Sequence, residues 1–266
     1  MAMEIRNAAR ERLERGELAL GVGLRTVRTV EIAKMMKTCG YDWIFIDLEH
    51  GPFTIETATS LSVAALDAGI APIVRVPFQQ YAMATRVLDG GALGIVMPHV
   101  DTADEARAIV DHLKYPPQGH RSLAGGQAIA DFRPVRTGEF AEAANRALLV
   151  VAMLEAPAAI GNAAAIAAVP GVDALLIGTN DLAAEMGIPG EFGHARIAAA
   201  YENVIAACRN AGKWAGVGGV YTEDLLKRYV GMGTKLVLTG GDSGFLMEAA
   251  GARAALARGW QGGSCD

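Results

Sequence analysis

The sequence predicts a (β/α)₈ barrel, and three observations lead to this fold class. Eight short runs rich in Val, Ile and Leu recur along the 266 residues, helix-period segments lie between them, and no linker or change of composition divides the chain. Apolar strands that alternate with amphipathic helices are typical of a parallel sheet covered by helices. Eight such units indicate one closed barrel domain over residues 1–266. The runs are residues 18–24, 42–48, 71–77, 93–100, 148–155, 173–178, 213–220 and 235–242.

The segments before and between the first runs carry helix patterns. Residues 1–17 are heavily charged and lack the apolar stretch of a secretory signal, so they are interpreted as a first helix. The segment EIAKMMKTCG, residues 31–40, repeats apolar side chains at helical spacing and stops at Gly40. Thr102 and Glu105 have the spacing of a capping box, and two prolines at 116 and 117 end the helix that follows.

One connection is longer than a barrel requires. The stretch PPQGHRSLAGGQAIADFRPVRTGEF, residues 116–140, is rich in Gly and polar residues and separates the fourth and fifth runs. Loops of this length are usually functional or mobile. After the eighth run, the segment that follows Asp242 predicts a helix, and a short flexible tail is expected from about residue 258.

Composition excludes several classes of partner. The net charge is −5 without a basic cluster, which gives no electrostatic footprint for nucleic acid. The longest apolar tracts are too short to span a bilayer, so no membrane partner is expected. Cys39, Cys208 and Cys265 are odd in number and far apart, which argues against disulfides and a thiolate zinc site. A reducing, cytoplasmic location is therefore expected.

Ionisable side chains lie at the ends of five successive predicted strands, where a barrel carries its chemistry. The second strand ends in Asp47, Glu49 and His50, the third in Arg75, the fourth in His99, the fifth in Glu155 and the sixth in GTND with Asp181. Because side chains alternate along a strand, Asp47 and Glu49 point the same way. Glu155 and Asp181 close neighbouring strands and can converge on one point. Two carboxylates without matching cysteine or histidine favour a hard divalent cation, Mg²⁺ or Mn²⁺, over zinc.

Each of these residues also has an ordinary structural interpretation. Asp181 is placed to cap a helix, and Glu155 could form a salt bridge with a barrel arginine. Arg75 interrupts an apolar run, as an arginine paired with a core carboxylate would. His50 could be a loop residue, and His99 could pack locally. Five strand ends in succession are nevertheless hard to explain by structural roles alone.

The motifs resemble a known family. DWIFIDLEHGPF, RVP, VLDGGALGIVMPHVDTADEA, YPPQGHR and MLEAPAAIGNAAAIAAVPGVDALLIGTNDLAAEMG occur in this order and, together, resemble the HpcH/HpaI family of class II pyruvate aldolases over about residues 15 to 250. The resemblance implies a barrel of the phosphoenolpyruvate/pyruvate-domain type whose last helix packs on a neighbouring subunit, usually in a hexamer that is a trimer of dimers. It implies a lyase that adds the enolate of pyruvate or a related 2-oxo acid to an aldehyde and also runs the cleavage.

The same resemblance assigns roles to strand-end residues. Glu155 and Asp181 match the family's ligands for Mg²⁺, Mn²⁺ or Co²⁺. His50 matches its acid/base histidine, with Asp47 in the same motif. Arg75 matches the arginine beside the substrate's keto oxygen.

Further positions are implied around the substrate. Asp89 matches an aspartate that reaches an adjacent subunit's site, and the backbone of Gly178, Thr179 and Asn180 is expected to approach the substrate carboxylate. Many relatives carry glutamine where this chain has Met153, which removes a polar group near the metal. The loop GHRSLAGG is expected to help define the aldehyde.

These roles agree with the chemistry of enolisation. The oxyanion of an enolate needs positive charge beside it, which a divalent cation and Arg75 would supply. A histidine has an unperturbed pKa of about 6.5, so His50 can exchange protons near neutrality. We hypothesise that Asp47 or Asp89 pairs with His50 and orients it.

Two other functions stay open from the sequence. The chain could be an acyl-CoA lyase like the citrate lyase β-subunit and malyl-CoA lyases, although it has no obvious basic run for the CoA phosphates. It could also be a barrel that binds a small acid without turning it over. The aldehyde acceptor and the choice of metal are not determined by the residues.

Overall fold

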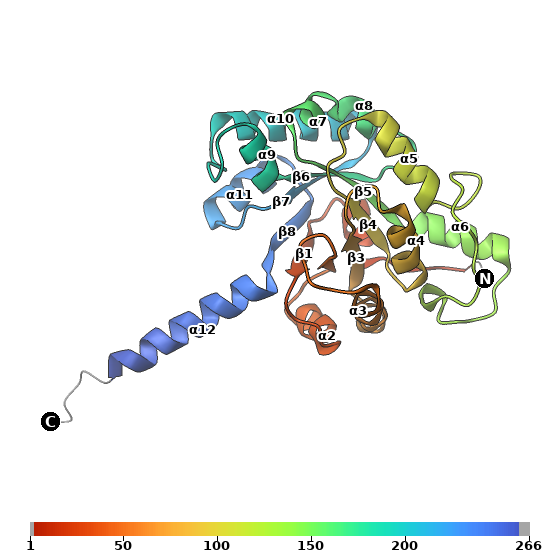
Figure 1. Ribbon diagram of the computed structural model, residues 1–266, viewed down its shortest axis with the longest axis horizontal. Helices are drawn as coiled ribbons and strands as arrows, with labels where there is room; N and C mark the ends of the chain where they lie inside the picture. The colour runs from red at the N-terminus through yellow and green to blue at the C-terminus, as the bar shows by residue number, and fades with distance from the viewer. Residues whose placement is uncertain (1–2, 261–266) are drawn as a thin grey trace.

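The computed structural model describes residues 3–260, which form a closed barrel of eight parallel strands paired in chain order, each with the next and β8 with β1 (Figure 1). The strands are β1 (Ala19–Leu24), β2 (Trp43–Asp47), β3 (Ala71–Arg75), β4 (Gly94–Met97), β5 (Leu149–Leu154), β6 (Ala174–Gly178), β7 (Trp214–Gly218) and β8 (Leu236–Gly241). Each of the eight predicted runs contains one of these strands. The predicted (β/α)₈ fold class is therefore confirmed.

Helices connect the strands and surround the barrel (Figure 1). They are α1 (Ala8–Glu14), α2 (Glu31–Thr38), α3 (Ile55–Ala68), α4 (Tyr81–Asp89), α5 (Ala103–Leu113), η1 (Ala128–Ala130), α6 (Thr137–Ala147), α7 (Pro157–Gly161), α8 (Ala163–Ala167), α9 (Thr179–Glu185), α10 (Ala195–Ala211), α11 (Glu223–Met232) and α12 (Asp242–Gly259). Among residues 3–260, no helix is long and apolar enough to cross a membrane.

Capping chemistry sets several helix boundaries as the sequence predicted. Thr102 accepts a hydrogen bond from the Glu105 amide, and the Glu105 carboxylate accepts one from the Thr102 amide, so the capping box before α5 is confirmed. The expected first helix is shorter than the charged run, because Asn7 caps it and α1 covers only Ala8–Glu14.

The strands bury apolar side chains on both faces, which explains their continuous apolar runs. One set fills the barrel interior and includes Trp43, Phe45, Ile73 and Leu176. The alternate set packs outward against the helices. This rigid double layer holds the strand ends, and the residues that follow them, in fixed positions.

The long connection lies at the start of the barrel strands. It contains η1 and leads into α6, and its apolar side chains pack on Tyr115 and Phe140 beside Met3 and Ile5. The loop therefore belongs to the end of the barrel opposite the carboxyl ends of the strands.

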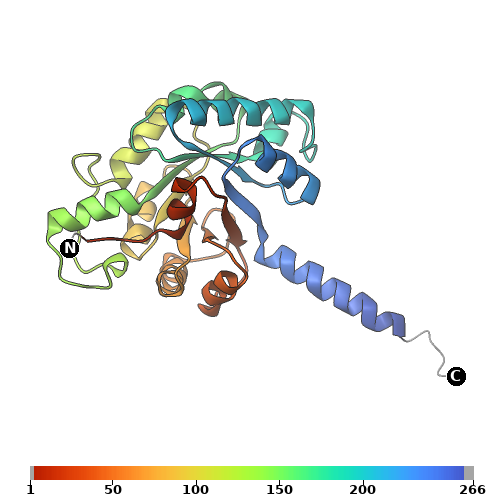
Figure 2. The ribbon, with the colours of Figure 1, turned by 180° about the vertical axis from the view of Figure 1, so that it is seen from behind.

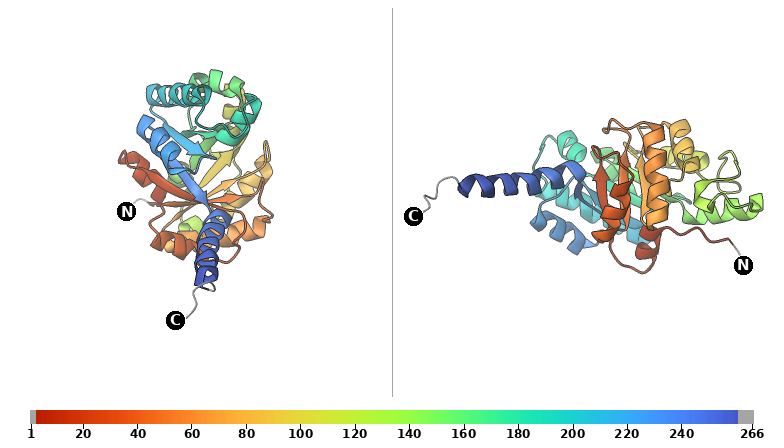
Figure 3. Two further views of the ribbon diagram at one scale, coloured as in Figure 1. Left: turned by 90° about the vertical axis from the view of Figure 1, so that its left-hand side faces the viewer. Right: turned by 90° about the horizontal axis from the view of Figure 1, so that it is seen from below.

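Helix α12 projects from the barrel in every view (Figures 1, 2 and 3). Its first residue, Asp242, is buried against the barrel, whereas Leu246, Met247 and Leu256 are exposed. The last helix thus does not cover its own barrel. Helix α12 continues to Gly259. The flexible tail predicted from about residue 258 falls mostly on residues 261–266, which lie outside the described residues.

Candidate active site

A cavity of about 180 Å³ opens at the carboxyl ends of the strands. It is lined by Arg25, Phe45, His50, Arg75, Met153, Glu155, Leu176, Gly178, Asn180, Asp181, Gly218, Gly219, Tyr221 and Leu238. Six of the nine residues assigned to the site from the sequence lie here directly. The expectation that chemistry gathers at this end of the barrel agrees with their placement.

A buried ion pair between Asp47 and Arg75 supports the cavity. Arg75 donates from Nε to Asp47 Oδ1 at 3.0 Å and from Nη2 to Oδ2 at 2.7 Å, a bidentate arrangement between two side chains that are almost completely buried. Burial opposes ionisation of Asp47, but the Arg75 guanidinium outweighs it and lowers the pKa of this carboxyl below its ordinary value. Arg75 is therefore held rigidly as a cation beneath the cavity.

Asp47 also organises the turn after β2. Its Oδ1 accepts hydrogen bonds from the amides of Glu49 and His50, at 3.1 and 3.2 Å. Its Oδ2 accepts one from Arg25 Nε at 2.8 Å. One carboxylate thus fixes two arginines and the backbone that carries the candidate base.

Glu49 lies between Arg75 and the His99 ring. Glu49 Oε2 lies 3.0 Å from Arg75 Nη1 as an ion pair without hydrogen-bond alignment, and Glu49 Oε1 lies 3.7 Å from His99 Nε2. The prediction that Asp47 and Glu49 point the same way is confirmed, since both contact Arg75. His99 has a φ of 52°, a conformation that non-glycine residues rarely adopt and that is often found at functional sites.

Glu155 presents an unsatisfied carboxylate oxygen at the site. Its Oε2 accepts the His99 amide at 2.9 Å, but Oε1 is buried without a hydrogen-bond partner among the described residues. The pKa of Glu155 is raised to about 8, chiefly by burial; the His99 hydrogen bond opposes this rise and the neighbouring Asp181 carboxylate adds to it. A cation bound beside Glu155 would favour its ionised form.

The backbone makes room for this carboxylate at Gly178. A Cβ added to Gly178 would lie 2.5 Å from Glu155 Oε1 and 2.7 Å from Met153 Cε, so only glycine fits. Met153 fills the adjacent space and makes only a 3.9 Å sulfur contact with Arg75 Nη1.

A hard divalent cation fits the donor set. Glu155 and Asp181 offer carboxylate oxygens, the ligands that Mg²⁺ and Mn²⁺ prefer, and Oε1 of Glu155 lacks another partner. Over residues 3–260 no group of three His, Cys, Asp or Glu side chains gathers as a metal cluster. Two carboxylates match the habit of Mg²⁺, which is usually bound through one or two carboxylates plus waters and substrate.

The hypothesis that Asp47 pairs with the His50 ring is wrong in this structure. The alternative that Asp89 pairs with His50 involves an adjacent subunit's site and stays a prediction. Asp47 binds the His50 backbone and two arginines, and the nearest carboxylate to the imidazole is Glu49, with Oε2 3.8 Å from Nε2. The His50 side chain is 54% exposed and lines the cavity. It therefore faces the cavity without a fixed partner on its ring.

Asp89 lies far from this chain's own cavity. It ends α4, which runs back toward the start of the strands, and its carboxylate binds Arg121 Nη2 at 2.6 Å and Gln127 Nε2 at 3.0 Å. The loop that holds Arg121 lines no part of the cavity among the described residues. The expectation that GHRSLAGG helps define the aldehyde is thus not met within one subunit.

The backbone after β6 is held in place by Thr179. Its hydroxyl donates to the Gly218 carbonyl at 2.8 Å and lies 2.7 Å from the Tyr201 hydroxyl, so the Thr179 side chain is fully engaged. Gly178 and Asn180 on either side of it line the cavity. Thr179 therefore contributes its backbone to this region, and its side chain fixes the turn.

Several residues of the cavity region were not assigned to the site from the sequence, among them three with polar side chains. Arg25 and Tyr221 line the cavity, and His99 contacts Glu155. Arg25 follows β1 directly, so the same strand-end rule that found Arg75 would have found it. His99 was recognised as a strand-end residue, but its contact with Glu155 depends on the positive φ, which has no sequence signal.

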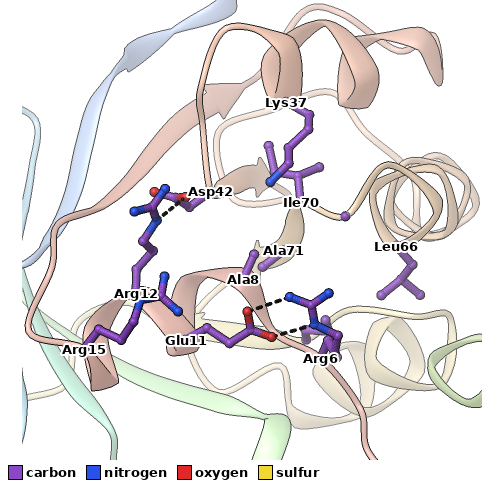
Figure 4. Close-up of a pocket in the computed structure, with 12 residues that line it drawn as sticks. Arg6, Ala8, Glu11, Arg12, Arg15, Lys37, Asp42, Leu66, Ile70 and Ala71 are labelled. Carbon is purple, nitrogen blue, oxygen red and sulfur yellow. Dashed lines mark hydrogen bonds and ion pairs between the residues drawn. The ribbon is translucent and has the colours of Figure 1, made fainter.

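A second cavity of about 410 Å³ lies at the opposite end of the barrel (Figure 4). Its charged side chains are largely paired: Arg6 binds Glu11, and Arg12 binds Asp42. Both carboxylates of its lining, Glu11 and Asp42, are therefore engaged by arginines. The smaller cavity at the strand ends is therefore the candidate active site.

Comparisons with known proteins identify the family of the chain. Residues 27–249 match the family model described as HpcH/HpaI aldolase/citrate lyase. The chain is 41% identical to the 4-hydroxy-4-methyl-2-oxoglutarate aldolase of Hapsidospora irregularis over 94% of this chain and 96% of that protein. It is 35% identical to the 4-hydroxy-2-oxo-heptane-1,7-dioate aldolase of Salmonella typhimurium over 94% of each chain. The crystal structure of an HpcH/HpaI aldolase from Desulfitobacterium hafniense superimposes with a TM-score of 0.88 at 28% identity and covers 96% of this chain and 97% of that one.

Proposed function

The chain belongs to the HpcH/HpaI aldolase/citrate lyase family, and from this premise we propose that it is a divalent-metal-dependent aldolase of 4-hydroxy-2-oxo acids. It cleaves the substrate to pyruvate or a related 2-oxo acid and a carbonyl compound, and it catalyses the reverse addition. Mg²⁺, Mn²⁺ and Co²⁺ are the candidate metals.

One observation carries this proposal. Glu155 keeps a buried carboxylate oxygen without a partner, in the same cavity as Asp181 and above the fixed cation Arg75. A carboxylate in this state is stabilised when a cation binds it. The same cation would stand beside the position where an enolate develops its charge.

Each residue of the site then has a separate task in the cleavage. His50 takes the proton of the 4-hydroxyl group, the C3–C4 bond breaks, and its electron pair passes to C3 and the 2-oxo oxygen. Arg75, held by Asp47, supplies fixed positive charge for that oxygen. A divalent cation held by Glu155 and Asp181 supplies Lewis acidity when bound. A proton returned to C3 completes the methyl group of pyruvate.

Substrate binding is proposed at the turn after β6. The backbone of Gly178, Thr179 and Asn180 would meet the carboxylate of the 2-oxo acid, because Gly178 and Asn180 line the cavity next to Glu155. The buried hydroxyl network of Thr179 would keep this backbone in place.

The acyl-CoA lyase alternative has weaker support. A citrate lyase β subunit from M. tuberculosis is 15% identical with a TM-score of 0.54, a likeness that shows the fold alone. The cavity of about 180 Å³ is also small beside the roughly 300–1,000 Å³ of pockets for drug-sized ligands. A compact 2-oxo acid suits it better.

The test is release of pyruvate from 4-hydroxy-4-methyl-2-oxoglutarate, coupled to lactate dehydrogenase and NADH. We expect turnover with Mg²⁺ or Mn²⁺ and its loss in excess EDTA, restored by added metal. Turnover that EDTA leaves intact, or cleavage only of acyl-CoA esters, would contradict the proposal.

We also propose that the protein is an oligomer, as a trimer of dimers, in which α12 packs on a neighbouring barrel. Exposed Leu246, Met247 and Leu256 on the projecting helix support this. In such an assembly Asp89 would reach an adjacent subunit's site. Light scattering after gel filtration should give a hexamer, and Leu246→Asp with Leu256→Asp should give smaller species, with Glu248→Gln as the control. A monomeric wild-type protein would contradict the proposal.

A cytoplasmic location is part of the same proposal. Cys39 and Cys208 are free cysteines, which suits a reducing compartment.

A further inference from the structure

Arg25 is a second cation at the candidate active site, and the proposed cleavage does not use it. It is the first residue after β1, it lines the cavity, and its Nε donates to Asp47 Oδ2 at 2.8 Å. Its side chain is 52% exposed, and within residues 3–260 no hydrogen bond or ion pair engages its two terminal nitrogens. One edge of the guanidinium is therefore anchored and the other is open.

The backbone of Arg25 is held as firmly as its Nε. The buried Asp242 carboxylate accepts hydrogen bonds from the amides of Arg25, Thr26 and Val27, at 3.2, 2.8 and 2.7 Å to Oδ2. Few surface arginines are fixed at both backbone and side chain. A cation fixed in advance loses less entropy when it binds an anion, and its planar fork matches a carboxylate.

Arg75 is not available for the same task. Its guanidinium is occupied by Asp47 at two nitrogens and by Glu49 at the third, and it is nearly fully buried. Arg25 is thus the arginine of the cavity lining whose terminal nitrogens can still bind a ligand, within the part of the chain described. The structure offers a carboxylate a second docking point, separate from Glu155 and Asp181.

We infer that Arg25 is the residue that binds a carboxylate on the carbonyl fragment that leaves in cleavage, so that Arg25 sets the preference of this protein for 4-hydroxy-2-oxo diacids over the corresponding monoacids. This inference rests on the proposed function. The cavity of about 180 Å³ suits a short diacid, in which the carboxylate is attached directly to the reacting carbonyl carbon. The acceptor class in the reverse reaction is therefore a short 2-oxo acid or glyoxylate.

A matched pair of substrates isolates this contact. Cleavage of 4-hydroxy-2-oxoglutarate breaks the C3–C4 bond to give pyruvate and glyoxylate. Cleavage of 4-hydroxy-2-oxopentanoate breaks the same bond to give pyruvate and acetaldehyde. The two substrates differ by a carboxylate in place of a methyl group on C4, and both release pyruvate to the same coupled assay.

The experiment compares kcat/KM for the two substrates on each variant of the metal-loaded protein. The wild type should prefer the diacid, and Arg25→Met should reduce the ratio of diacid to monoacid by roughly 10- to 100-fold, as expected for one charge-assisted contact. Arg25→Lys should give an intermediate ratio. Because both rates come from one preparation, partial loss of folding cancels from the ratio.

Arg28→Met is the control, since Arg28 lies in the same segment, contacts the Phe53 ring and does not line the cavity. Its ratio should equal that of the wild type. A wild-type ratio near one, or a ratio that survives in Arg25→Met, would overturn the inference while leaving the aldolase intact. If Arg25→Met is inactive on both substrates, the Arg25→Lys variant decides. A ratio of diacid to monoacid equal to that of the wild type overturns the inference, and a reduced ratio supports it. A wild type that cleaves neither substrate with metal refutes the proposed function itself.

Discussion

At the level of single residues, Asp47 has the largest structural influence on the site. Its carboxylate binds Arg75 through two nitrogens, Arg25 through one, and the amides of Glu49 and His50. Because the side chain is fully buried, loss of its charge would leave Arg75 buried without its main partner, which costs about 3–5 kcal/mol for buried pairs. Asp47 is therefore a positioning residue for the groups around it.

Substitution of His50 tests the acid/base role. His50→Ala should lower turnover by about 10²- to 10⁴-fold, the usual contribution of a general acid or base. Mn²⁺ affinity should stay at the wild-type level, because the proposed ligands are Glu155, which follows β5, and Asp181, which lies on α9. Steady-state cleavage measures the turnover, and calorimetric titration measures the Mn²⁺ affinity. The control is His112→Ala, whose ring stacks on Tyr81 outside the cavity; turnover of His50→Ala equal to that control would refute the role.

The sequence predicts part of this residue-level picture and misses the rest for a physical reason. Strand-end position and side-chain alternation were enough to bring Asp47, Glu49 and Arg75 together. They could not show that Asp47 would bind the His50 backbone and not its ring, because that choice depends on the path of the turn. The sequence missed the contact of His99 with Glu155 for the same reason, because this contact depends on the backbone conformation of the turn after β4.

At the level of elements, the last residue of β6 leaves space for the side chain of the residue that follows β5. Gly178 leaves space for Glu155 Oε1, where an added Cβ would approach to 2.5 Å. Strand pairing of Leu154 with Ile177 sets this closeness, so the site depends on the register of two neighbouring strands. The eight strands were predictable from apolar runs, because both faces of a barrel strand are buried. The course of residues 116–140 was not, since loop packing leaves no periodic pattern.

Gly178→Ala tests this arrangement. The new methyl group should displace the Glu155 carboxylate and weaken Mn²⁺ binding by roughly 10- to 100-fold, as changes beside metal ligands usually do. Gly161→Ala is the matched control, because a Cβ there meets nothing within 4 Å. Calorimetric titration with Mn²⁺ measures both variants. Equal affinity in the two would show that Glu155 does not need this space.

At the level of the whole molecule, the two ends of the barrel have different tasks. Within residues 3–260, the carboxyl ends of the strands carry a carboxyl oxygen of Glu155 and terminal nitrogens of Arg25 that have no partner, whereas the opposite end carries paired charges, as in the cavity of Figure 4. Chemistry at one end and stability at the other is the usual division in this fold. Lys114 belongs to the stabilising end, where its Nζ donates to the carbonyls of Asn145 and Leu148 at 2.7 and 3.1 Å.

Lys114 should make stability depend on pH. Burial lowers its pKa from 10.5 to about 8, although Asp173 opposes this shift. Between these two values the unfolded chain keeps a proton that the folded chain has released, so this group's contribution to the free energy of unfolding rises with pH. From pH 7 to pH 10 the wild type should gain about 2–3 kcal/mol relative to Lys114→Met. Urea denaturation of both proteins measures the difference, and a value independent of pH would contradict the assignment.

The measurement that tests the central claim most directly is exchange of the pyruvate methyl protons in D₂O, followed by proton NMR. It needs only pyruvate, the protein and Mg²⁺, so it does not depend on the identity of the carbonyl acceptor. We predict that the methyl signal disappears with Mg²⁺, persists in excess EDTA, and is lost far more slowly with Glu155→Ala. A signal that persists with bound Mg²⁺, or that decays equally in EDTA, would contradict a metal-dependent enolate site in this barrel.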